Sequence, residues 1–175
     1  MAAKVIHQEQ RVAILVDVQN MYHSAKHIFD SRVNFDALLQ EAVAGRKLIR
    51  SLAYVVKSEL EEEKAFFEAL TKAGFEVKSK DLQIFPGGAK KADWDVGLCM
   101  DAIRLANQVD VIILATGDGD FVPLVDFLKS THGTLVEVMA FSKSASSKLR
   151  EAADYFIDLG QEPERFLMRI KRRVR

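Results

Sequence analysis

Two aspartates stand where an apolar run of the chain stops. Asp118 and Asp120 follow the run VIILA of residues 111–115, with only Gly119 between them. A short all-apolar run is typical of a strand that is buried on both faces. Asp118-Gly119 could simply form a turn, and Asp120 could cap the helix that starts at Phe121. Two carboxylates about 4 Å apart, however, repel each other by about 4 kcal/mol at an effective dielectric constant near 20, so a proton or a cation must offset the repulsion.

Asp17 supplies a third carboxylate, because it follows a second apolar run, VAILV at residues 12–16. Because Asp17 directly follows five apolar residues of an expected strand, it is harder to explain as a residue that only stabilises a turn. If the two strands are neighbours in a parallel sheet, their carboxyl ends lie at the same edge. We therefore expect Asp17, Asp118 and Asp120 to form one site.

Three further aspartates belong to the helix that precedes residues 111–115. Asp93 and Asp95 stand at its start, where either could cap the helix or favour the positive end of its dipole, and Asp101 could be an exposed helix residue. Asp95 and Asp101 lie about 240° apart at about 100° per residue, so both cannot point into one pocket. Asp95 is preferred as the fourth member, because a helix start lies nearer the strand ends. Asp93 and Asp101 are secondary acidic candidates.

A site made of carboxylates favours Mg²⁺ or Mn²⁺, which prefer oxygen ligands and keep several waters. The four histidines are scattered, and no His/Cys spacing indicates zinc. One ion or a pair could activate water and stabilise charge on a phosphodiester undergoing displacement. In this hypothesis Asp17, Asp118 and Asp120 share the metal, and Asp95 positions a second ion or the attacking water.

Strands and helices alternate along the chain, which predicts an α/β fold with a parallel sheet covered on both faces. The expected strands cover residues 12–16, 48–56, 75–77 with 82–85 as an extension, 111–115, 135–141 and 155–159. The expected helices cover residues 35–44 after a cap at Asn34, 60–73, 94–107, 121–130, 145–153 and 162–170. In such sheets, sites lie beyond the carboxyl ends of the strands, near the point where the strand order reverses.

The composition fits one domain with a sizeable core, since 49% of the 175 residues are apolar. The 25 basic and 25 acidic residues cancel, which argues against purely electrostatic nucleic-acid binding but leaves a local basic patch open. The single cysteine, Cys99, excludes an intrachain disulfide and fits a cytoplasmic protein. Residues 1–10 contain no apolar core like that of a signal peptide, and no apolar run approaches the roughly 18 residues of a membrane span, so we expect no membrane partner.

Cations and hydroxyl groups near the expected site could bind a nucleic-acid backbone. The candidates are Lys90 and Lys91 before the acidic helix start, and Ser142, Lys143, Ser144, Ser146, Ser147, Lys148 and Arg150 after the fifth strand. Tyr22 and Trp94 could stack on bases. Alternatively, the lysines are solvated and Trp94 packs at a helix start. The tail RIKRRVR, residues 169–175, either extends an RNA path or is a frayed terminus.

Four segments carry motifs in a fixed order. Residues 17–20 read DVQN, residues 91–95 read KADWD with Asp101 beyond, residues 116–121 read TGDGDF, and residues 149–159 read LREAADYFIDL. Together they resemble the D-x-x-N, K-x-x-D-type, S/T-G-D-x-D-F and C-terminal segments of the NYN domain. The likeness is strongest to the LabA-like (DUF88) branch of the PIN-like nuclease superfamily, and it covers residues 11–160.

The resemblance implies a three-layer α/β/α PIN-like Rossmannoid with a parallel sheet of strand order 3-2-1-4-5. It would span residues 11–160, between an N-terminal extension of residues 1–10 and a C-terminal helix and basic tail of residues 161–175. It also implies a metal-dependent endoribonuclease that acts on RNA. The metal-binding and catalytic acids would be Asp17, Asp95, Asp118 and Asp120. Asn20 would assist ligand or phosphate binding, and Thr116 stands where the family often has serine.

Other functions stay open at this point. The same pocket could serve a non-catalytic regulator that binds RNA or protein. Other phosphohydrolases and nucleotide-binding enzymes fit less well: a haloacid dehalogenase needs D-x-D after the first strand, a Toprim domain needs Glu there, and a dinucleotide site needs G-x-G-x-x-G. The exposed face of the helix at residues 60–73 could support a homodimer, although nothing in the sequence singles it out.

Overall fold

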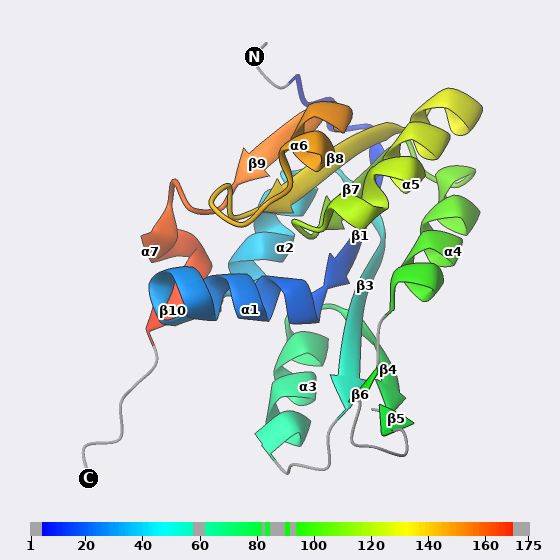
Figure 1. Ribbon diagram of the computed structural model, residues 1–175. Helices are drawn as coiled ribbons and strands as arrows, with labels where there is room; N and C mark the ends of the chain where they lie inside the picture. Colours follow the sequence, from blue (N-terminus) through cyan, green and yellow to red (C-terminus); the bar gives the residue numbers. More distant parts are fainter. Residues whose placement is uncertain (1–4, 58–61, 82, 85–89, 92–93, 170–175) are drawn as a thin grey trace, which may run out of the picture.

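Six parallel strands of the described chain form one central sheet (Figure 1). This computed structural model describes residues 5–57, 62–81, 83–84, 90–91 and 94–169. The strand order is β4-β3-β1-β7-β8-β9, and every neighbouring pair is parallel. The strands are β1 (Arg11–Asp17), β3 (Lys47–Lys57), β4 (Glu76–Asp81), β7 (Val111–Ala115), β8 (Leu135–Ala140) and β9 (Tyr155–Asp158). The first five main strands thus follow the order 3-2-1-4-5, and the fold prediction is confirmed, with β9 as an added edge.

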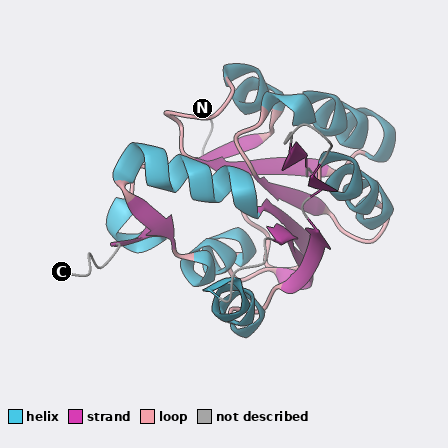
Figure 2. Cartoon of the chain, turned by 60° about the horizontal axis from the view of Figure 1, so that its bottom comes forward, coloured by secondary structure: helices cyan, strands magenta, loops and turns pink. Residues whose placement is uncertain are grey.

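Helices cover both faces of this sheet (Figures 1 and 2). One face carries α1 (Val18–Phe29), α2 (Phe35–Val43) and α3 (Glu62–Lys72), and the other carries α4 (Asp95–Ala106), α5 (Val122–Phe127) and α6 (Ser147–Ala152).

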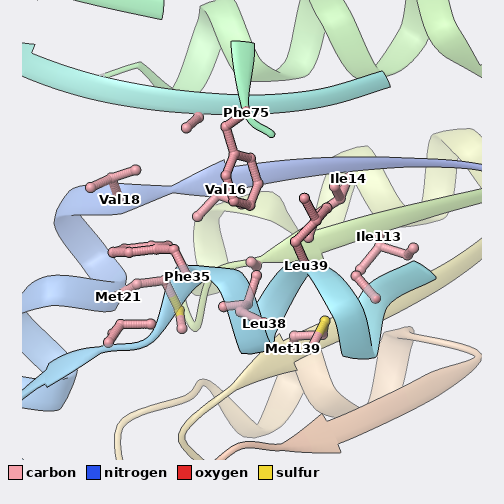
Figure 3. Close-up of a cluster of buried hydrophobic side chains, with 14 of the residues drawn as sticks. Ile14, Val16, Val18, Met21, Phe35, Leu38, Leu39, Phe75, Ile113 and Met139 are labelled. Carbon is pink, nitrogen blue, oxygen red and sulfur yellow. The ribbon is translucent and has the colours of Figure 1, made fainter. Parts of the chain in front are cut away.

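β1 lies between two apolar cores. Val12, Ile14 and Val16 belong to one core, and Ala13 and Leu15 belong to the other. Figure 3 shows the first core, in which Ile14 and Val16 share a cluster with side chains of α2. Because successive strand residues point to opposite faces and both faces are covered, the strand must be apolar throughout. This burial fixes the place at which Asp17 leaves the core.

Several boundaries agree with the sequence prediction. Asn34 caps α2, since its Oδ1 accepts a hydrogen bond from the backbone N of Ala37 at 3.2 Å. That helix ends at Val43, and its C-cap, Ala44, has a φ of 46°, in the left-handed region. α4 begins at Asp95 after Trp94. The predicted start of α3 at Leu60 lies outside the described residues.

α1 is the main element that the sequence prediction omitted. It starts directly after β1 because Asp17 is both the last residue of the strand and the N-cap of the helix. Val18, Met21 and Ala25 bury its inner face. The spacing of these three residues is helical, but the polar and ring-bearing residues between them obscure the apolar stripe. The short strand β2 (Ser31–Val33) follows and was also not predicted.

Two other segments differ from the prediction. β5 (Gln83–Ile84) pairs antiparallel with β6 (Lys90–Lys91) and does not extend β4, while residues 82 and 85 lie outside the described chain. The helix expected at residues 121–130 is divided into a 3₁₀ turn (Gly119–Phe121), α5, and a π-helical turn (Leu128–His132). α5 starts at Val122 with Pro123 in its first turn, where the missing backbone N–H of proline is tolerated.

The final helix is shorter than expected. α7 covers Pro163–Phe166, and β10 (Leu167–Arg169) then pairs antiparallel with β2. The backbone turns extended at Leu167 (φ −123°, ψ 142°) because β2 offers it a strand partner from far along the chain. The prediction of a helix continuing to residue 170 is therefore wrong from Leu167 to Arg169.

Among the described residues, no helix has the length and apolar character that crossing a membrane requires.

Candidate metal centre

The strand order of the sheet reverses between β1 and β7. β3 lies on one side of β1 and β7 on the other, and β1 and β7 run parallel with Val16 opposite Ala115. Asp17 ends β1, and Thr116 directly follows β7. Both acid-bearing segments therefore leave the sheet at one edge, which is where open α/β sheets place their ligand sites.

Asn20 joins these two segments. The Oδ1 atom of Asp17 accepts a hydrogen bond from the backbone N of Asn20 at 3.1 Å. The Oδ1 atom of Asn20 in turn accepts one from the backbone N of Gly117 at 2.9 Å. Space is limited at Gly117, because an added Cβ would lie 3.0 Å from the Cα of Ala145. The side-chain oxygen of Asn20 thus connects the start of α1 to the segment that follows β7.

Thr116 aligns two of the acids. Its side chain is fully buried, and its hydroxyl donates to Oδ2 of Asp17 at 3.4 Å and accepts from the backbone N of Asp118 at 3.2 Å. The Oδ1 atom of Asp118 accepts from the backbone N of Asp120 at 2.9 Å, so Asp118, and not Asp120, caps the turn that follows. The turn interpretation of Asp118-Gly119 is correct, and this same turn presents both carboxylates.

Asp95, Asp118 and Asp120 form a close group of carboxylates. One potential ligand oxygen from each lies within 4.8 Å of the others. Asp95 and Asp118 are partly buried, and Asp120 is exposed. Asp17 lines the same cleft as Asp95 and Asp118. The structure thus brings together the four aspartates that the sequence singled out, from three separate segments of the chain.

The electrostatics of this edge favour a cation. Burial raises the pKa of Asp17 above its ordinary value, against the hydrogen bond from the backbone of Asn20, and the charges of Asp95 and Asp118 raise it further. A carboxylate whose ionised form is disfavoured by burial and by like charges is stabilised by a bound cation. The donor set consists of carboxylate oxygens, which suits a hard divalent ion.

Asp17, Asp95 and Asp118 line a cleft of about 450 Å³. Its other lining residues include Gln19, Asn20, His23, Ser24, His27, Trp94 and Ser144. The sequence prediction did not place His23, Ser24 and His27 there, because it assigned no helix to residues 18–29. The spacing of the two histidines, four residues apart, was the available signal: on a helix it puts both on one face.

Asp101 points to a different environment. Its Oδ2 atom accepts hydrogen bonds from the hydroxyl of Tyr54 at 2.7 Å and from Nζ of Lys78 at 2.6 Å. Burial works to raise the pKa of Asp101, but Lys78, Tyr54 and Arg104 together hold it below the ordinary value. Asp101 therefore joins α4 to β3 and β4 through hydrogen bonds. Asp93 lies outside the described residues.

The predicted substrate-contacting residues are dispersed. The backbone N of Ser142 donates to Asp158 at 3.0 Å, next to β9. Lys143 lies over the ring of Phe29, with its Nζ 5.8 Å from the ring centroid, and Lys148 is exposed on α6. None of these three lines the cleft, and the side chain of Lys91 is outside the described part of the structure.

Trp94 lies at the edge of the cleft but is held by the protein. Its Nε1 donates to the backbone oxygen of Val55 at 2.8 Å, and its ring packs on Tyr54. An added Cβ at Gly97 would lie 2.7 Å from the indole. These contacts support the interpretation of Trp94 as a packing residue at a helix start.

Comparison with known proteins decides the family. The family model of the NYN domain matches residues 11–160. The chain belongs to the NYN domain family. This membership places it in the PIN-like nuclease superfamily, as its motifs implied.

Two relatives of this NYN chain extend the comparison. The low amplitude and bright protein LabA of Synechococcus elongatus is 28% identical over 160 residues, covering 85% of this chain and 83% of LabA. A solved structure of a protein of unknown function from Vibrio parahaemolyticus is 32% identical and superposes with a TM-score of 0.85. That match covers 94% of this chain and the whole of the Vibrio chain, so the same fold recurs throughout.

Proposed function

We propose that this NYN domain is a metal-dependent endoribonuclease that cleaves phosphodiester bonds of RNA at the cluster of Asp17, Asp95, Asp118 and Asp120. The observation that carries the proposal is the convergence of three carboxylates within 4.8 Å at the switch point of the sheet. Membership in a family of nuclease-type domains supports hydrolysis as the reaction.

The chemistry of the donor set fits Mg²⁺ or Mn²⁺. Asp95, Asp118 and Asp120 can each offer an oxygen to the same point. The pKa of Asp17 is raised mainly by burial and further by the charges of Asp95 and Asp118, so a bound cation would stabilise its ionised form. A bound divalent ion would supply Lewis acidity and lower the pKa of a coordinated water. Asp17, Asp95, Asp118 and Asp120 would hold it, and whether one ion or two bind is open to measurement.

The surrounding residues keep these acids in place. Thr116 and the backbone N of Asn20 hydrogen-bond to the two oxygens of Asp17, which fixes the orientation of that carboxylate. The turn beginning at Asp118 turns Asp120 toward the same side. In the mechanism that we propose, Asp95, at the first turn of α4, orients the attacking water against the phosphorus, and the amide of Asn20 contacts a phosphate oxygen.

RNA is the proposed partner and the cytoplasm the proposed location. Because the numbers of acidic and basic residues are equal, the net charge of the protein does not attract RNA. RNA binding must therefore rely on individual groups at the cleft.

Incubation with a mixed set of single-stranded and structured RNAs tests the proposal. We expect cleavage with Mn²⁺ or Mg²⁺ and none with EDTA, because the proposed reaction needs a bound ion to activate water and to stabilise charge on the phosphodiester. Products are resolved on a denaturing gel. Binding of RNA without cleavage under every metal condition would instead identify a non-catalytic regulator, and the nuclease proposal would be wrong.

A further inference from the structure

We propose that the outer side of α1 seats unpaired nucleotides of single-stranded RNA next to the acidic cluster. The seat consists of Gln19, His23 and His27, called here the α1 stripe. This inference rests on the proposed function for its substrate class. It adds the surface of the protein that would favour single-stranded over paired RNA.

The α1 stripe is continuous with the acidic site. Its residues stand at spacings of four, so they lie on one face of the helix, and all three line the same cleft as Asp17, Asp95 and Asp118. All three are exposed. At about 1.5 Å per residue, the stripe extends about 12 Å from the first turn of α1. A strand leaving the acids along this side of the cleft therefore meets it directly.

The rings on this face suit stacking with bases. The rings of His23 and His27 lie 6.1 Å apart between centroids and 21° from parallel. Tyr22 contacts His23 edge-on, with centroids 5.5 Å apart and planes at 72°. Aromatic side chains stack on bases that are not already stacked in a duplex, which is how proteins recognise single strands without reading sequence. Paired bases would have no free face to offer these rings.

The side chains of α1 itself fit a phosphate backbone. The sequence of the helix, VQNMYHSAKHIF, contains no acidic residue. Nζ of Lys26 lies 5.6 Å from the ring centroid of Tyr22, and Lys143, outside the cleft lining, lies over Phe29 at the C-terminal end of α1. The hydroxyl of Ser144 donates to that of Ser24 at 2.9 Å, so two hydroxyl groups lie together in the cleft wall. These groups can contact phosphate oxygens beyond the acids.

Binding without cleavage tests this seat. Fluorescence anisotropy with a labelled 12-nucleotide single-stranded RNA of mixed sequence, in EDTA, compares the natural protein with the double variant His23→Ala/His27→Ala. We expect the Kd of the variant to rise about 10-fold or more, since each stacked base contributes about 1–3 kcal/mol and about 1.4 kcal/mol is tenfold in affinity. The variant His23→Phe/His27→Phe keeps the rings and should stay within about 3-fold of the natural protein.

His132→Ala is the matched control. That imidazole contacts Asn107 and Phe127 and does not line the cleft, so its removal should leave the Kd unchanged. A blunt-ended RNA duplex of the same length should bind no tighter to the natural protein than to the double Ala variant. Unchanged single-strand binding by that variant would overturn the inference, as would equal weakening by the Phe variant or equal loss for the duplex.

The outcomes separate this inference from the proposed nuclease activity. Loss of single-strand binding in the double Ala variant supports the α1 stripe even if no RNA is cleaved with Mn²⁺. If the natural protein cleaves RNA with Mn²⁺ and that variant binds single-stranded RNA as tightly as the natural protein, the proposed role of the α1 stripe is wrong and the nuclease proposal stands. Thermal unfolding of each variant confirms that it is folded before binding is measured.

Discussion

Replacing Asp118 by Asn should lower the rate of metal-dependent RNA cleavage by about 10²–10³-fold, the loss typical of removing one preorganised electrostatic group from an active site. Asp118 belongs to the close carboxylate group and also adds to the charge felt by Asp17. Asn keeps a side-chain oxygen that can accept the hydrogen bond from the backbone of Asp120, so the turn is retained while the charge is lost. Single-turnover cleavage at saturating protein measures the effect on the chemical step.

The control for this variant is Asp126→Asn. Asp126 is exposed on α5 and lies outside the carboxylate group, so its loss changes net charge equally but leaves the site intact. Its cleavage rate should stay within about 2-fold of the natural protein, as is usual for surface substitutions. If Asp118→Asn and the natural protein cleave RNA at equal rates, Asp118 has no role in the reaction.

Mn²⁺ should stabilise the natural protein against heat, and Asp17→Asn should abolish most of that gain. A ligand at 100 times its Kd adds about 2.7 kcal/mol to folding stability, which is about 5–10 °C in Tm for a domain of this size. Asn can still cap α1, because Asn and Asp are comparable N-cap residues. The variant therefore loses a metal ligand with little change to the helix start. Scanning calorimetry with Mn²⁺ or EDTA measures both Tm values.

Without metal, the same substitution should raise stability at neutral pH. Because the pKa of Asp17 is raised in the folded state, the folded protein holds its proton at pH values where the unfolded chain has lost it. Stability is therefore lost as the pH rises from the ordinary pKa of Asp, 3.8, to the raised pKa of the folded state. Asp17→Asn removes this loss, so in EDTA at pH 7 its Tm should exceed that of the natural protein.

The predicted order of the two Tm values reverses between EDTA and excess Mn²⁺. The variant should be the more stable protein in EDTA and the less stable one in excess Mn²⁺. The metal response of the natural protein should also weaken as the pH falls through the raised pKa of Asp17, since protons compete with the ion. If the natural protein and the variant gain the same Tm from Mn²⁺, Asp17 does not bind it.

The acids of the site could be located from the sequence because local patterns predict the strand and helix ends at which they stand. Asp17 and Asp118 each follow an apolar run that only a doubly covered strand explains, and parallel strands bring those ends to one edge. Asp95 followed from its place at a helix start. These inferences needed no knowledge of distant contacts, and the fold and the convergence of the acids agree with them.

The rest of the cleft depended on contacts between distant parts of the chain. Asp101 has the same residue type as Asp95, but only the approach of Tyr54 and Lys78 from β3 and β4 decides that it is hydrogen-bonded elsewhere. The end of α7 depends on β2, which is more than 130 residues earlier in the chain. His23 and His27 were missed for a different reason: the helix that carries them has a short apolar stripe, and its cap residue was interpreted only as an acid of the site.

The most direct test of the proposed metal site is a crystal structure of the protein soaked in Mn²⁺, with anomalous diffraction to locate the ion. We predict an anomalous peak at the carboxyl ends of β1 and β7, within about 2.1 Å of oxygens from at least two of Asp17, Asp95, Asp118 and Asp120. An ordered site with these carboxylates in the same arrangement and no peak among them, at a Mn²⁺ concentration that saturates metal-dependent activity or stability, would contradict it.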